Sequence, residues 1–243
     1  MALKIIETEK YDLKSPYFVV GFPGIGLVGT MAASFLVEKL GMEQFGHVVS
    51  EKFSPIASIH NSVPLHPTRF YKSRKHNLVV LFSELVIPLN SIYLLSQEIY
   101  AWAKAHKVRQ IISLGGINQK GEQDTVYGIG SMPALSQVLE RKGVTLIREG
   151  ATTGVSGVLM ADCATRKFPA VSLLAEAHAE YMDPKGAAMV LEALSRLTNT
   201  KIDTSALEKQ GKLIEGKMKQ LMEQAKGSHE DYEKTSRLGP MYG

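Results

Sequence analysis

A glycine-rich turn is the first feature of the chain that could do chemistry. Residues Gly24 to Gly29 satisfy the G-x-G-x-x-G pattern between an expected strand and an expected helix, where backbone N–H groups can hold a phosphate. The ribose-binding acid that should follow is poorly matched, because Glu51 comes late in the chain. Phe22-Pro23 also costs the loop a backbone donor. A tight turn packed against the sheet is the alternative, and both interpretations stay open.

A second candidate site surrounds the stiff loop Pro64-Leu65-His66-Pro67. Each proline keeps the preceding residue out of the helical region, so the loop could present His66 rigidly. His66 and Arg69 could then bind a substrate anion and, with Gly24 and Gly26, form a ligand pocket for a nucleoside or phosphate compound. The alternative is a histidine that is hydrogen-bonded within its own loop.

The other motifs of enzyme chemistry are incomplete. Gly21 to Gly26 and Gly116 to Gly121 have P-loop spacing but lack the lysine that should follow. No two histidines have the H-E-x-x-H spacing of a metal site, and the hydroxyl-rich run 152–157 is expected to cap a helix. Cys163 is predicted to be a small buried hydrophobe. These motifs therefore single out no catalytic residue, no metal and no cofactor.

Composition restricts the class of protein. The 243 residues are 44% hydrophobic and 21% charged, as in ordinary globular proteins. The 28 basic residues are interleaved with 24 acidic ones, which argues against a nucleic-acid partner. The longest apolar run, residues 78–89, is too short and too polar to span a membrane. With a single cysteine and no apolar leader, a cytoplasmic location is expected.

Hydrophobic periodicity predicts an α/β fold, with helices on both faces of a layered sheet. Strands or extended segments are expected at residues 3–6, 17–21, 47–50, 56–61, 68–71, 78–82, 111–114 and 144–147. Helices are expected at residues 27–40, 92–106, 131–141, 155–165, 170–181 and 184–197. Asp183 should cap the last of these helices, with Pro184 in its first turn.

The C-terminal forty residues differ from this core. The predicted division is an α/β core at 1–203, a polar helix at 204–226 opened by a capping box at Ser205, and a flexible tail at 227–243. The tail ends in Met241, Tyr242 and Gly243. An apolar side chain, a tyrosine and a terminal carboxylate on a tether have the form of a peptide ligand.

Several segments together resemble the PAC2 family. Residues Gly21 to Gly29 are similar, as a nine-residue unit, to the signature loop of that family. Further matching segments follow in the family's order, at residues 59–69, 115–116, 153–159, 174–176 and 183–188. The resemblance covers about Leu3 to Leu207.

The resemblance implies a three-layer α/β/α sandwich like that of purine nucleoside phosphorylases, and a homo-oligomer, with a tetramer or a pentamer as the expected size. The family includes homologues of the proteasome-assembly chaperones. Some archaeal members carry a C-terminal hydrophobic-Tyr-X motif that inserts between α-subunits of the 20S proteasome. Here that motif maps onto Met241, Tyr242 and Gly243. The function that this resemblance implies is an ATP-independent proteasome assembly chaperone or proteasome-binding factor that is not an enzyme.

Two other functions remain open at this point. The phosphorylase-like fold could retain an enzymatic pocket built from Gly24, Gly26, His66 and Arg69. Alternatively, the protein could be a scaffold whose tail binds a different protein, with the apolar stripe at residues 207–225 recruiting a helix.

Overall fold

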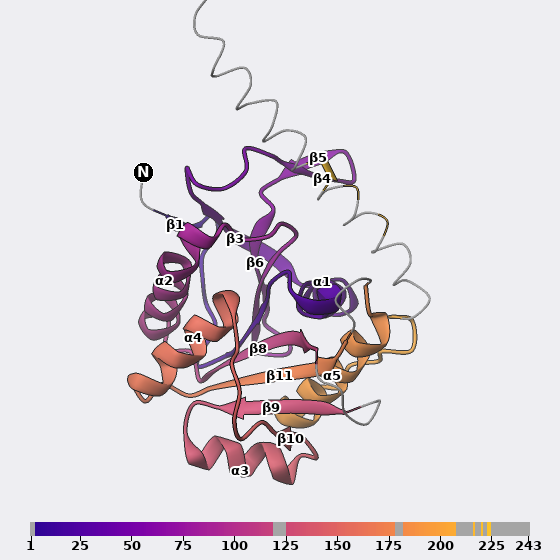
Figure 1. Cartoon of the computed structure of the whole chain (residues 1–243). Coiled ribbons are helices and arrows are strands. Elements are labelled where there is room, and N and C mark those ends of the chain that lie inside the picture. The colour runs from indigo at the N-terminus through magenta and orange to yellow at the C-terminus, as the bar shows by residue number, and fades with distance from the viewer. Residues whose placement is uncertain are drawn as a thin grey trace, which may run out of the picture.

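A computed structural model describes residues 3–118, 125–177 and 182–207 of the chain, together with residues 216, 220, 223 and 224 (Figure 1). A central sheet of nine strands has the order β1-β3-β6-β7-β2-β8-β11-β9-β10. Its strands are β1 (Lys4–Glu7), β2 (Tyr17–Gly21), β3 (Glu43–Val49), β6 (Thr68–Ser73), β7 (Leu78–Ser83), β8 (Gln110–Ile117), β9 (Val126–Gly130), β10 (Thr145–Leu146) and β11 (Ala170–Glu176).

The middle of the sheet is parallel. Strands β7, β2, β8 and β11 run in one direction, and β6 and β9 flank them in antiparallel pairing. Parallel strands are buried on both faces and need crossover connections, which explains their continuous apolar runs such as LVVLFS in β7. The carboxyl ends of these four strands form one edge of the sheet, called the carboxyl edge here, and their starts form the amino edge.

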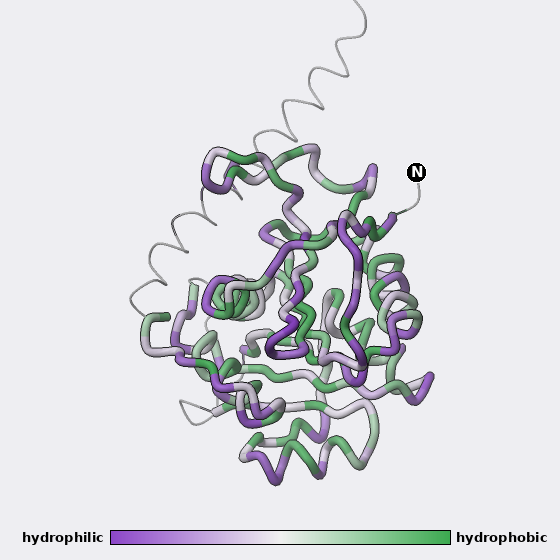
Figure 2. Tube along the Cα trace, turned by 180° about the vertical axis from the view of Figure 1, so that it is seen from behind, coloured by the Kyte–Doolittle hydropathy of each residue, from purple (hydrophilic) through white to green (hydrophobic). Residues whose placement is uncertain are grey.

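Helices cover both faces of the sheet (Figure 1). They are α1 (Val28–Lys39), α2 (Ile92–Ala105), α3 (Pro133–Arg141), α4 (Gly154–Thr165) and α5 (Pro184–Thr198). Buried residues of α1, α3 and α5 share one hydrophobic cluster, and those of α2 and α4 share a second cluster. Figure 2 shows hydrophobic and hydrophilic stretches following one another along the chain. The predicted layered α/β sheet is confirmed.

A separate hairpin projects beyond the carboxyl edge (Figure 1). It pairs β4 (Ser58–His60) with β5 (Val63–Leu65) through a turn in which Asn61 and Ser62 have left-handed backbone angles. Ile59 and Val63 are exposed on this hairpin by 71% and 53%. The sequence predicted an extended segment at 56–61 and a stiff loop at 64–67, because each proline keeps the residue before it out of the helical region. Residues 63–65 instead pair with β4 as the strand β5.

One predicted helix is wrong, and the strand β9 was not predicted, as β5 was not. Residues 170–176 form β11, although a helix was expected at 170–181, of which 178–181 lie outside the described residues. Six of the seven β11 residues are buried between β8 and β9. A strand buried on both faces has no polar alternation, so its sequence resembles a buried helix. The strand β9, which the sequence did not predict, contains Gly128 and Gly130. Glycine weakens the sequence pattern that indicates a strand.

The predicted capping of α5 is confirmed, because the Asp183 carboxylate accepts a 2.8 Å hydrogen bond from the Gly186 N–H.

Beyond α5, Leu207 is fully buried in the cluster under α1 and α5. Of the predicted helix 204–226, the described positions 216, 220, 223 and 224 are helical, and the tail 227–243 lies outside the described residues. None of the helices in the described part of the chain has the length and hydropathy that crossing a membrane requires.

Candidate functional site

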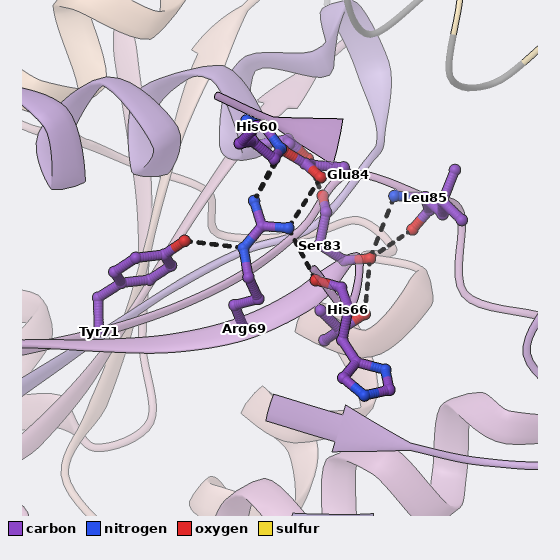
Figure 3. Close-up of polar contacts among 9 residues, drawn as sticks. His60, His66, Arg69, Tyr71, Ser83, Glu84 and Leu85 are labelled. Atoms are coloured by element: carbon purple, nitrogen blue, oxygen red, sulfur yellow. Dashed lines mark hydrogen bonds and ion pairs between the residues drawn. The ribbon is translucent and has the colours of Figure 1, made fainter. Parts of the chain in front are cut away.

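The polar residues of interest gather at the carboxyl edge, where open α/β sheets usually bind ligands. Glu84 directly follows β7, and Arg69 lies at the start of the antiparallel neighbour β6, opposite Phe82. The hairpin β4–β5 brings His60 and His66 to the same place (Figure 3). The sheet therefore assembles residues that are up to 24 positions apart in the chain.

Arg69 and Glu84 form a buried ion pair at the centre of this cluster. Their side chains are only 2% and 7% exposed. The guanidinium donates to both carboxylate oxygens, at 2.8 and 3.0 Å, in the bidentate geometry that suits these two groups. Burial alone would lower the pKa of Arg69, but the hydrogen bonds and the negative charge of Glu84 outweigh it and raise that pKa. Arg69 is therefore a fixed cation.

Four of the five N–H groups of the Arg69 guanidinium donate to acceptors within the protein (Figure 3). Nε donates to the Tyr71 hydroxyl at 2.7 Å, and Nη1 also donates to the His66 carbonyl at 2.7 Å. Nη2 lies 3.4 Å from Nε2 of His60. His60 Nε2 also lies 2.9 Å from Glu84 Oε1, a carboxylate oxygen to which it can only donate. The bonds to Tyr71, His66 and Glu84 therefore use four of the five guanidinium donors. An anion that accepted from two donors of Arg69 would have to displace at least one of these partners.

His66 points its ring away from Arg69 (Figure 3). The imidazole stacks on His47 of β3, with the ring centroids 4.0 Å apart and the planes at 7°. Burial, and secondarily the neighbouring His66, lower the pKa of His47. Arg69 thus contacts the backbone of His66, and the two side chains do not converge on a shared volume. Both interpretations of His66, an anion site shared with Arg69 and a histidine hydrogen-bonded within its own loop, therefore stay predictions.

A cavity of about 720 Å³ adjoins this cluster. It lies between the ends of β1 and β3, the loop 50–57 and the segment 83–87, and His66, Thr68 and Ser83 line one side. The remaining lining is mainly apolar, with Phe53 and Val86 among its residues. This volume is within the range of small-molecule sites. Gly24 and Gly26 are not among its lining residues.

The glycine-rich turn packs against the sheet with its own backbone. A Cβ on Gly29 would lie 2.3 Å from the Leu114 carbonyl oxygen, and one on Gly116 would lie 2.3 Å from that of Ile25. Gly26 has a φ of 60° and accepts a 2.9 Å hydrogen bond from the Asp183 N–H at the start of α5. Close packing thus accounts for glycine at positions 29 and 116. The ligand pocket of Gly24, Gly26, His66 and Arg69 remains a prediction.

Two further candidates from the sequence are Cys163 and the hydroxyl-rich run 152–157. Cys163 is buried in the cluster under α2 and α4, and burial raises the pKa of its thiol to about 12. Ser156 at the start of α4 accepts a 2.7 Å hydrogen bond from Ser113 of β8. Within the described ranges, no group of three or more histidine, cysteine, aspartate or glutamate residues could hold a metal ion.

Comparison with known proteins gives the family. The sequence profile of the PAC2 family matches residues 18–222, which is most of the chain. The chain belongs to the PAC2 family. The segments that carried the resemblance include the glycine turn before α1, the hairpin β4–β5 and the start of α5. In this PAC2 protein those three segments all lie at the carboxyl edge of the sheet.

Solved structures of PAC2-like proteins resemble this chain closely. Pyrococcus furiosus PbaA, an archaeal homologue of a proteasome-assembly chaperone, is 28% identical, with a TM-score of 0.83 over 93% of this chain and 99% of that one. P. furiosus PbaB, an archaeal proteasome activator, is 27% identical, with a TM-score of 0.75 over 90% and 98% of the two chains. An uncharacterized Methanocaldococcus jannaschii protein, MJ0106, is 30% identical over 92% of both chains.

Sequence reasoning missed the partners of Arg69. Glu84 lies inside the apolar run 78–89 and Tyr71 ends the expected strand 68–71, and neither was among the predicted site residues. A charged residue that directly follows a fully apolar strand is the available signal, because such a residue must find a counter-charge where the strand leaves the core. No local pattern indicates which basic residue supplies that charge.

Proposed function

We propose that this PAC2 protein is a proteasome assembly chaperone or proteasome-binding factor of the cytoplasm, and that it acts without ATP and without catalysis. The observation that carries the proposal is its similarity, over nine-tenths of the chain, to both PbaA and PbaB at 27–28% identity. One of these relatives is a homologue of an assembly chaperone and the other is an activator, so the proposal covers both roles.

We propose further that Met241, Tyr242 and Gly243 dock on the α-subunits of a 20S proteasome. The methionine would fill an apolar groove, the tyrosine would add contact area with a polar tip, and the carboxylate would pair with a cation. A homo-oligomeric core would present several tails to a ring of equivalent pockets. Weak single contacts would then suffice, because linked tails raise one another's effective concentration.

The decisive experiment removes Met241 to Gly243 and measures binding to purified archaeal 20S proteasome in the absence of nucleotide. Binding should weaken by about tenfold or more, which corresponds to about 1.4 kcal/mol. The matched control replaces Lys234, Thr235 and Ser236 of the same tail by alanine and should bind like the unaltered protein. Equal binding by the deleted and complete chains would contradict the docking mechanism.

A second variant isolates the terminal charge. A semisynthetic protein with a C-terminal amide at Gly243 keeps both side chains and loses the carboxylate. Its affinity for the proteasome should fall, as that of the tail-deleted chain does, because charge-assisted hydrogen bonds are the strong ones.

A pull-down from cell extract with complete and tail-deleted baits separates proteasome docking from a scaffold role, in which the tail would retain a different protein.

A further inference from the structure

Positive charge gathers on the amino edge of the sheet. Four segments meet there, namely residues 8–16, 74–77, 104–109 and 166–169, and together they are called the basic edge. They contain nine lysines and arginines but only two carboxylates, Glu9 and Asp12. All nine basic residues are exposed: Lys10, Lys14, Arg74, Lys75, Lys104, Lys107, Arg109, Arg166 and Lys167. Since the whole chain carries only +4, the rest of it is net negative.

The register of the sheet places these segments in one row. Tyr17 of β2 pairs with Leu78 of β7 and with Gln110 of β8, and Ala170 of β11 pairs with Ile111. The starts of four neighbouring strands are therefore level, and at about 4.8 Å between strands the row extends about 14 Å.

Hydrogen bonds tie the segments of the basic edge to their neighbours. Asn77 donates to the Lys14 carbonyl at 3.0 Å, the Arg109 N–H donates to the Pro16 carbonyl at 2.8 Å, and the Ile111 N–H donates to the Pro169 carbonyl at 3.0 Å. The arrangement of the row is thus fixed by the backbone.

Within the part of the chain that the structure describes, most of these cations have no acidic partner. Arg74 is the exception, since it pairs with Asp12 at 2.7 Å and with Glu43 at 2.9 Å. Two other guanidinium groups lie over aromatic rings, Arg109 at 5.3 Å from the Tyr17 centroid and Arg166 at 4.4 Å from that of Tyr100. Stacking leaves their charge available and limits their motion, which favours a pre-organised positive surface.

We propose that the basic edge binds an acidic surface of a partner protein, independently of the C-terminal tail. The six exposed large apolar side chains in the described residues, from Ile6 to Tyr93, all lie outside these four segments, so the edge offers no insertion face to a membrane. The Tyr17 and Tyr100 rings are covered by arginine, which removes them as stacking platforms for nucleic-acid bases. Asp12 and Glu43 at one end also suit a protein surface of mixed charge better than a uniform phosphate backbone.

The test measures binding of a fluorescent poly-glutamate peptide to the full chain at low and high ionic strength. The variant Lys14→Glu/Lys75→Glu/Lys104→Glu reverses three charges of the basic edge and should bind roughly tenfold more weakly. The matched control is Lys4→Glu/Lys52→Glu/Arg141→Glu, which makes the same change in net charge outside the edge. Each triple variant alters one residue in the last turn of a helix, Lys104 or Arg141, so their costs to folding are comparable.

The proposal is supported if the peptide binds in a salt-dependent way, the edge variant loses that binding and the control keeps it. It is overturned if both triple variants lose binding equally, since net charge would then explain the effect. Duplex DNA or phosphatidylserine vesicles, titrated in parallel, overturn the assignment to an acidic protein if either binds as tightly as the peptide. Tail deletion should leave this binding unchanged, which keeps the result separate from proteasome docking.

Discussion

At the scale of single residues, the buried pair Arg69–Glu84 determines how the carboxyl edge is built. Two charges removed from water are tolerated because the geometry is bidentate, because other donors of Arg69 reach the Tyr71 hydroxyl and the His66 carbonyl, and because His60 Nε2 lies 2.9 Å from the Glu84 carboxylate. These contacts connect β6, the end of β7, the hairpin strand β4 and the residue that follows β5. The pair therefore anchors the segment that carries the exposed Ile59 and Val63.

Replacing Glu84 by glutamine should destabilise the protein by about 3–5 kcal/mol, because it leaves Arg69 buried without a counter-charge. The free energy of unfolding from urea titration measures this loss. The double variant Arg69→Met/Glu84→Leu is the control, since it removes both charges and should cost much less than the single change. A double variant that is as unstable as Glu84→Gln would show that the uncompensated charge is not the cause.

At the scale of elements, the contact between α1 and the sheet depends on glycine. Helix α1 lies so close to β8 that position 29 has no space for a side chain, and Gly21 at the end of β2 is equally close to the Gly29 carbonyl oxygen, at 2.2 Å from its missing Cβ. The same pattern in a dinucleotide site would serve a phosphate as well. Here packing alone explains both glycines.

Substitution Gly29→Ala should therefore destabilise the fold by about 1–3 kcal/mol, because α1 or β8 must move to admit the methyl group. The matched control is Gly24→Ala in the same turn, where the nearest atom to the new Cβ is the Phe22 carbonyl oxygen at 4.0 Å. Gly24 has extended backbone angles that alanine also adopts, so this change should stay within about 0.5 kcal/mol. Thermal unfolding compares the stability of the two variants. Equal losses of stability in both would argue against the packing explanation.

At the scale of the whole molecule, the hydrophobic core continues past α5. Leu207 is fully buried and Ala206 packs beside it, whereas the predicted core ends at residue 203. The boundary at residue 203 stays a prediction, and the packing of Leu207 indicates that the segment 204–207 contributes to the stability of the core.

A chain that ends at residue 203 should therefore unfold at a lower temperature than one that ends at residue 207. The loss of Leu207 from the core should cost about 2–5 kcal/mol. Leu207→Ala in the complete chain should reproduce most of the difference, which excludes a general effect of shortening. Identical melting temperatures for the two shortened chains would place the end of the core before residue 204.

Local periodicity and contiguous motifs were enough to predict the α/β class, the strand–turn–helix unit at residues 17–39, the cap of α5 and the family. Three features depend on packing between distant segments: residues 170–176 form a strand, Arg69 pairs with Glu84, and nine scattered cations form one edge. The physical reason is common to all three. A strand buried on both faces has no local signature, and neighbours across a sheet are set by strand order and register, which depend on contacts between distant segments.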